Sequence, residues 1–229
     1  MQNKTRDMSR LIIIFLTFIL LQSCNTQLVT NRIDEYLDDS IKVDTLNIPI
    51  DANQSYFPLK VFTDTSIYIG HDTFIVKWYS KHLSAMKEPL MFNKTQNKII
   101  YRFLWLRTSD NPVAIRIEKQ LDTYNLTWKL CDGAGGYDPG KLVVNKTKSI
   151  DKETWGNFIT LLNKSGFWNL NTNEVDIQCE DGAQWILEGV DRRRYHVVDR
   201  NSPLGGSFYD CCNFLIGLTD LKIKSDNKY

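Results

Sequence analysis

Between residues 98 and 147 the chain contains four successive runs in which apolar and polar residues alternate. The runs cover residues 98–107, 112–118, 123–130 and 141–147. Because side chains alternate between the two faces of a strand, each run predicts a β-strand with one apolar face. The first connections are short, which favours antiparallel neighbours, since a parallel crossover needs about a dozen residues. We therefore expect an antiparallel meander with one face on a core and a solvated face carrying Arg102, Arg116 and Lys129, for which a ligand site is the alternative.

A further alternating region, residues 183–200, predicts a β-hairpin around a polar break at residues 191–193. With a three-residue loop, Glu188 lies opposite His196, and Arg200 shares their face. The apolar face then consists of Trp185, Leu187, Tyr195 and Val197, and the other face carries Ile186 and Val198 among its polar residues. A two-residue loop would slip the pairing by one and exchange the faces of one strand. We favour the three-residue loop because it gathers the apolar residues on one side.

Three stretches with helical spacing accompany the strands. Asp72, Asp151 and Ser207 are suitable N-caps, and the pair Glu88-Pro89 stops the first helix. The apolar positions of the three helices are Ile75, Tyr79, Leu83 and Met86; Trp155, Phe158, Ile159 and Leu162; and Phe208, Cys211, Cys212 and Leu215. These patterns predict about three helices packed on the sheet.

Short apolar runs at residues 45–50, 57–62 and 66–69 are typical of strands. Together with the meander, the hairpin and the helices, they predict an α+β fold. The domain would cover residues 45–224, either as one unit or as two subdomains that meet near residue 150.

The first 23 residues have the features of a secretory signal peptide. Lys4, Arg6 and Arg10 precede an apolar run of eleven residues, 11–21. That run is too short for a membrane-spanning helix, which needs about 18 or more apolar residues.

The sequence Leu-Gln-Ser-Cys at residues 21–24 resembles a bacterial lipobox. The resemblance implies that Cys24 is lipidated, for example with palmitate, and becomes the first residue of the mature chain. Residues 24–44 are polar and would form a tether. We therefore expect a lipid-anchored protein of the bacterial cell envelope, in the outer membrane rather than the inner one. The alternative is an ordinary signal peptide in which Cys24 has no role.

The charge balance excludes one class of partner. Removal of residues 1–23 takes away three of the 28 basic and one of the 27 acidic residues, which leaves a nearly neutral chain. Nucleic-acid-binding proteins show a basic surplus, so we expect no nucleic acid partner.

Four cysteines follow Cys24, namely Cys131, Cys179, Cys211 and Cys212. Four cysteines permit three full pairings, and the exported location favours disulfides. One of the two adjacent cysteines could pair with Cys179, or all could be buried free thiols. The sequence contains no Cys-x-x-Cys and no histidine pair at ligand spacing, so we expect neither a metal site nor a cofactor.

The segments DGAQWILEG (residues 181–189) and YHVVDR (residues 195–200) resemble those of a set of bacterial lipoproteins without an assigned activity. The likeness extends over residues 78–89, the loop at residues 133–140 and the helix around Trp155. It implies a shared domain and an envelope location, but it implies no mechanism.

Two groups of residues are candidates for function. Glu188, His196 and Arg200 could form a hydrolase site in which the carboxylate orients a histidine base and the arginine holds an anion. No Gly-x-Ser-x-Gly nucleophile motif accompanies them. The alternative is a polar pair across two strands.

The second group is made of loop residues that could contact a ligand. Tyr137 and Asp138 lie in a glycine-rich loop at residues 132–140, which is otherwise typical of a wide hairpin connection. Three consecutive arginines, Arg192, Arg193 and Arg194, occupy the hairpin tip, where solvation alone would explain them. The leading hypothesis is a non-catalytic binding or accessory module for a glycan, a peptide or another envelope protein. The alternative is an envelope hydrolase that uses the Glu188, His196 and Arg200 group.

Overall fold

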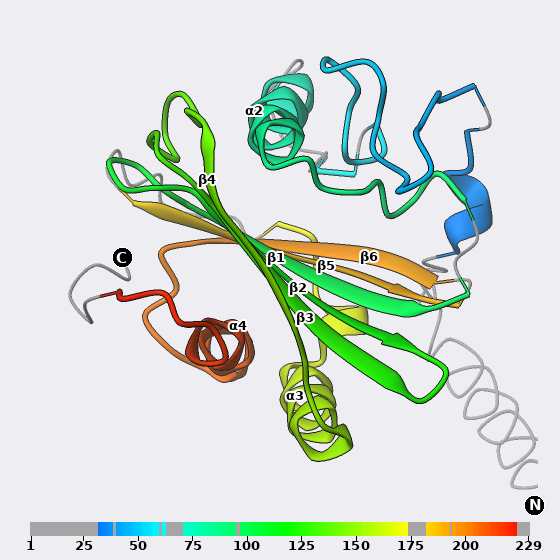
Figure 1. The fold of residues 1–229 in the computed structure, drawn as a ribbon, viewed down its shortest axis with the longest axis vertical. Helices are drawn as coiled ribbons and strands as arrows, with labels where there is room; N and C mark the ends of the chain where they lie inside the picture. The colour runs from blue at the N-terminus through cyan, green and yellow to red at the C-terminus, as the bar shows by residue number, and fades with distance from the viewer. Residues whose placement is uncertain are drawn as a thin grey trace, which may run out of the picture. The chain divides into compact units, whose positions relative to one another are not determined.

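A computed structural model describes residues 32–38, 40–59, 61–62, 71–94, 97–173, 182–192 and 194–223 (Figure 1). The predicted signal peptide, Cys24, Cys179, Arg193 and the predicted strand at residues 66–69 lie outside these ranges.

Six strands form one antiparallel sheet in the order β4-β3-β2-β1-β5-β6. The strands are β1 (Ile99–Arg107), β2 (Val113–Gln120), β3 (Thr123–Cys131), β4 (Leu142–Ser149), β5 (Ala183–Asp191) and β6 (Arg194–Asn201). The first four form the expected meander, and the β5–β6 hairpin joins it through antiparallel pairing of β5 with β1. The predicted α+β fold with a meander sheet is therefore confirmed, and strands from both sides of residue 150 belong to the same sheet.

The three predicted helices are present. They are α2 (His71–Ala85), α3 (Lys152–Ser165) and α4 (Ser207–Gly217), and two short 3-10 helices, η1 (Ile33–Glu35) and η2 (Phe167–Asn169), accompany them. The carboxylate of Asp151 caps α3 by accepting from the backbone N–H of Thr154 at 2.7 Å. The expected cap at Ser207 is wrong, because Gly206 occupies the N-cap position and makes no side-chain bond.

Both faces of the sheet are covered (Figure 1). The first face packs against α3, η2 and α4, and it contains the apolar residues that the alternation of β1, β2 and β3 predicted. The second face packs against α2 and the segments before and after it. The prediction of a solvated second face with Arg102, Arg116 and Lys129 is therefore wrong. β1 also presents Ile100, Leu104 and Leu106 on that face, as strands of doubly covered sheets do.

The described part of the segment before α2 is irregular in structure. The described residues of the runs at 45–50 and 57–62 form no strand, and an isolated bridge joins Pro49 to Val43. Tyr56, Phe57 and Phe62 are nevertheless buried in the second core, so their pattern reflects burial rather than strand structure.

The predicted tether is too long at its C-terminal end. Arg32 pairs with Arg194 at the start of β6, and Ile33 is fully buried against the sheet. The chain therefore joins the folded domain at Arg32 instead of near residue 44.

The hairpin has a two-residue loop, so the predicted three-residue loop is wrong. Asp191 pairs with Arg194, and Glu188 pairs with Val197 instead of His196. Arg192 has a positive φ of 56°, which two-residue hairpin loops require. The expectation of one apolar face failed because both faces of the hairpin are buried, so both carry apolar residues.

Candidate functional site

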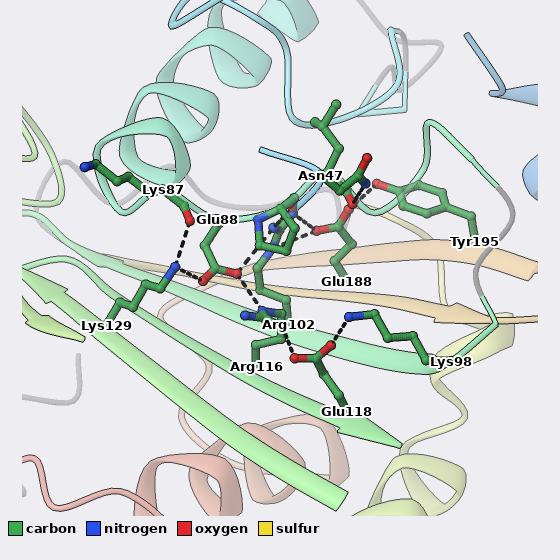
Figure 2. A network of polar contacts seen from close by, with 12 residues as sticks. Asn47, Lys87, Glu88, Lys98, Arg102, Arg116, Glu118, Lys129, Glu188 and Tyr195 are labelled. Carbon is green, nitrogen blue, oxygen red and sulfur yellow. Dashed lines mark hydrogen bonds and ion pairs between the residues drawn. The ribbon is translucent and has the colours of Figure 1, made fainter. Parts of the chain in front are cut away.

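The main buried charge cluster of the described chain lies on the second face of the sheet, under the segment that follows α2 (Figure 2). We call it the ionic network. It consists of Glu88, Lys98, Arg102, Arg116, Glu118, Lys129 and Glu188, together with the hydroxyl of Tyr195. Its basic members come from β1, β2 and β3 and the residue just before β1, which the meander places next to one another.

Glu88 is the centre of the network. The chain leaves α2 through Lys87, whose positive φ of 51° ends the helix, and Glu88 then points onto the sheet with only 1% of its side chain exposed. Its carboxylate lies 3.0 Å from Nε of Arg116, 2.9 Å from Nζ of Lys129 and 3.6 Å from NH1 of Arg102. Burial alone would raise the pKa of Glu88, but the three cations outweigh it and lower the pKa to about 2.

Arg102 connects Glu88 to a second buried carboxylate. Its Nε donates to Oε2 of Glu188 at 3.1 Å, its NH2 forms an ion pair with the same oxygen, and its NH1 donates to the carbonyl oxygen of Pro89 at 2.7 Å. The hydroxyl of Tyr195 donates to Oε1 of Glu188 at 2.8 Å. Burial raises the pKa of Glu188, although Arg102 and Tyr195 favour the carboxylate. The pKa values of the two carboxyl groups, Glu88 and Glu188, are therefore shifted in opposite directions.

The network reaches solvent on the side of Lys98. Glu118 forms ion pairs with both Arg116 and Lys98, and the Lys98 side chain is 31% exposed. On the other side, Nζ of Lys129 also donates to the carbonyl oxygen of Lys87 at 2.8 Å. The charged groups thus satisfy one another and fasten the segment after α2 to β1, β2 and β3.

A buried amide pair reinforces this fastening. Nδ2 of Asn47 donates to the carbonyl oxygen of Leu90 at 2.7 Å and to Oδ1 of Asn93 at 2.9 Å. The segments before and after α2 are therefore joined to each other as well as to the sheet. The ionic network and the amide pair therefore have a structural role: their polar groups bond to other protein atoms and hold the segments around α2 on the sheet.

The predicted group of Glu188, His196 and Arg200 is not assembled. Glu188 faces the second core, while His196 and Arg200 face the first core on the opposite side of the sheet. A ring nitrogen of His196 bonds with the carbonyl oxygen of Leu170 at 2.9 Å, and Arg200 donates to that of Thr172 at 3.0 Å. Burial lowers the pKa of His196 to about 4. The bonds of His196 and Arg200 to these carbonyl oxygens hold the chain after η2 against β6.

The glycine-rich loop is well ordered by backbone bonds, and its glycines have steric reasons. A Cβ on Gly135 would lie 2.6 Å from the carbonyl oxygen of Arg107, and Gly140 has a φ of +68°. The carboxylate of Asp138 accepts from the N–H of Gly140 at 2.9 Å. Tyr137 is 65% exposed and lies in a turn. The structural role of the loop is therefore shown, and Tyr137 remains a candidate for contact.

Sequence reasoning missed two aromatic residues beside this loop. Nε1 of Trp78 in α2 donates to the carbonyl oxygen of Gly135 at 2.9 Å, and the ring of Phe74 lies 6.2 Å from that of Trp78. Phe74 is 65% exposed. The bond from Trp78 to Gly135 brings α2 to the loop that carries Tyr137, and we call Phe74, Trp78 and Tyr137 together the aromatic surface. The spacing of four residues between Phe74 and Trp78 on a helix was the available signal.

The described arginines of the hairpin tip are exposed. Arg194 forms an ion pair with Asp191 at 2.6 Å, and its guanidinium carbon lies 4.2 Å from the ring centre of Trp168. Arg192 is also exposed. This geometry suits a solvated tip and leaves both guanidinium groups accessible.

The three cysteines that the structure describes, Cys131, Cys211 and Cys212, are buried free thiols. Burial raises the pKa of Cys131 to about 11 and that of Cys211 to about 12, so both are protonated at neutral pH.

Over the ranges described, no three His, Cys, Asp or Glu side chains cluster in a way that could bind a metal ion. None of the described helices has both the length and the apolar character needed to cross a bilayer.

Comparisons with protein-family models, with curated proteins and with solved structures give no match for this chain.

Proposed function

We propose that the chain is a lipid-anchored protein of the bacterial cell envelope that works as a non-catalytic binding or accessory module. The observation that carries this proposal is the N-terminal pattern of basic residues, an apolar run and the Leu-Gln-Ser-Cys segment ending at Cys24. The resemblance to bacterial lipoproteins at residues 181–189 and 195–200 supports the same location, with the outer membrane as the favoured site.

The structure removes the main argument for the alternative, an envelope hydrolase. That alternative required Glu188 to orient His196, but the two side chains lie on opposite faces of the sheet. His82 and His196 are both buried, and burial lowers the pKa of each to about 4. A general base works best when its pKa lies near the operating pH, so neither histidine is well suited to that role at neutral pH.

The aromatic surface is the favoured contact site for a ligand. Exposed aromatic rings stack on sugar rings and on the side chains of peptides, and Asp138 lies next to Tyr137 as a nearby polar group. Phe74 and Tyr137 are each 65% exposed, so stacking would require no rearrangement of the core. A glycan or a peptide of the envelope is therefore the proposed partner class.

Lipidation can be tested by metabolic labelling with radioactive palmitate, followed by fractionation of the envelope. We expect label and membrane association in the wild type and the loss of both in Cys24→Ala. Cys212→Ala is the control, because it removes a cysteine elsewhere and should leave labelling unchanged. Equal labelling of Cys24→Ala would refute the anchor.

Binding can be tested separately on arrays of envelope glycans and peptides. The double variant Phe74→Ala with Tyr137→Ala should lose about tenfold or more in affinity for any ligand found, since stacked aromatic residues dominate such contacts. Leu121→Ala also removes an exposed large side chain, but from the β2–β3 turn, and should bind normally. Equal weakening by both changes would exclude the aromatic surface as the site.

A further inference from the structure

The length of chain between Cys24 and the folded domain limits how far the domain can lie from a membrane. Arg32 already pairs with Arg194, and Ile33 is buried, so eight residue steps separate Cys24 from the first anchored residue. An extended chain spans at most about 3.6 Å per residue, which limits this link to about 29 Å. The tether of residues 24–44 expected from the sequence would have allowed more than twice that distance.

The sheet has two different ends, and the link leaves from one of them. Arg32 contacts the β5–β6 tip, and the register Ile99 with Lys119 places the β2–β3 tip at the same end of the sheet. The opposite end, where Arg107 pairs with Ala183, carries the glycine-rich loop (Figure 1). We call the end with the β5–β6 and β2–β3 tips the tether end. Its exposed residues include Arg32, Leu121, Arg192 and Arg194.

The exposed groups of the tether end match the surface of an anionic bilayer. The side chains of Arg32 and Arg194 are 60% and 52% exposed, and guanidinium groups bind phosphate oxygens in a bidentate manner. Leu121, at the β2–β3 turn, is 85% exposed and has a positive φ of 53°. Leu121 and the arginines share this end of the sheet, and a surface that combines basic and exposed apolar residues is typical of proteins that lie at the membrane interface.

Acidic residues at the tether end weaken the attraction of its arginines to lipid phosphates. The anchor would compensate for this weakness by holding the tether end near the membrane. Asp34 lies 2.8 Å from Arg32, and Asp191 lies 2.6 Å from Arg194. Exposed ion pairs contribute little, so a lipid phosphate can compete for these arginines. A short tether raises the effective concentration of such a weak contact to the millimolar range or above. The contact would thus form only in the anchored protein.

We propose that, in the anchored protein, the tether end lies against the membrane, where Arg32, Arg192 and Arg194 bind the phosphate groups of anionic phospholipids. This inference rests on the proposed lipid anchor at Cys24. It assigns an orientation in which the tether end faces the lipid and the aromatic surface, at the other end of the sheet, faces away from it.

The test uses the full-length mature protein, lipidated and reconstituted in vesicles of phosphatidylglycerol or of phosphatidylcholine. Phenylglyoxal modifies accessible arginines, and mass spectrometry reads the rate at each position. We expect Arg192 and Arg194 to be modified at least fivefold more slowly in phosphatidylglycerol vesicles than in phosphatidylcholine vesicles. Each basic residue near an anionic surface contributes about fivefold to binding.

Variants with equal changes in charge make the result specific. Arg192→Glu should abolish the protection of Arg194 in phosphatidylglycerol, whereas Lys141→Glu, at an exposed residue near the opposite end, should leave it intact. Equal rates in the two lipids, or equal effects of the two variants, would overturn the proposal. Mass spectrometry of the intact protein separates the two hypotheses, because an unmodified Cys24 refutes the anchor, whereas a lipidated protein without protection refutes only the orientation.

Discussion

Replacement of Glu88 by glutamine should strongly destabilise the protein, because Glu88 is the centre of the buried ionic network. The substitution keeps the size of the side chain and removes its negative charge. Arg102, Arg116 and Lys129 would then remain buried around a neutral amide, and removal of one partner from a buried ion pair costs about 3–5 kcal/mol.

The pKa of Glu88 gives a second estimate of the magnitude. A decrease from the ordinary value of 4.5 to about 2 corresponds to about 3 kcal/mol in favour of the folded state at pH 7. Because the folded-state pKa is the lower one, this stabilisation is present above pH 4.5 and is lost as the pH falls toward 2. The two estimates agree, and both attribute the effect to the same three cations.

Urea unfolding followed by tryptophan fluorescence measures the difference. We expect Glu88→Gln to lower the free energy of unfolding by about 3–5 kcal/mol at pH 7, and the gap to the wild type to close between pH 4.5 and 2. The pKa of Glu188 is shifted upward instead, but Glu188 is present in both proteins, so its contribution largely cancels in the difference. Glu153→Gln, at an exposed residue in the first turn of α3, is the control and should cost less than about 1 kcal/mol.

A loss of less than about 1 kcal/mol for Glu88→Gln, or a gap that does not change with pH, would refute the role given to the network. It would mean that water or movement of the segment after α2 screens the three cations.

Trp185→Ala should cost about 3–5 kcal/mol in urea unfolding, because the indole is fully buried in the first core; a loss below about 1 kcal/mol would place it at the surface. The pKa of His196, measured by NMR titration, should be near 4 and should not change in Glu188→Gln; a pKa that changes with Glu188 would contradict the hairpin register. Because the folded-state pKa is the lower one, the stability that comes from burying the neutral imidazole is fully present above pH 6.5 and is lost as the pH falls toward 4. Gly135→Ala should cost about 1–3 kcal/mol through contact with the backbone of β1, whereas Gly156→Ala, which has open space around it in α3, should be neutral or stabilising; similar losses would show that the loop is not tightly packed.

The sequence predicted the meander and the helices well because their signals are local. Alternation in β1, β2 and β3 marks the first core, apolar spacing marks α2 and α3, and the cap at Asp151 marks the start of α3. The cap expected at Asp72 is wrong, because α2 already includes His71. The candidate site could not be found in this way. Glu88 looked like a residue that merely ends a helix, because its three partners lie 14 to 41 positions later in the chain and meet it only once α2 covers the sheet.

The hairpin register failed for a related physical reason. A choice between loops of two and three residues depends on which face is buried, and here both are. Ile186 and Val198 were already visible as apolar residues on the face expected to be polar. They were the signal that a second layer covers the sheet, as were Ile100, Leu104 and Leu106 on β1.

The central position of β1 has a consequence for the order of folding. Its partner β2 follows directly, but its other partner, β5, arrives only after about 80 further residues. Until β5 docks, β1 is a long apolar edge whose unpaired backbone can join another chain, and Arg102 lacks the carboxylate of Glu188. A fragment that ends near residue 150 would therefore contain a complete meander and still aggregate. Non-local pairing of this kind is slow, which makes the docking of the last hairpin the step at which misassembly competes with folding.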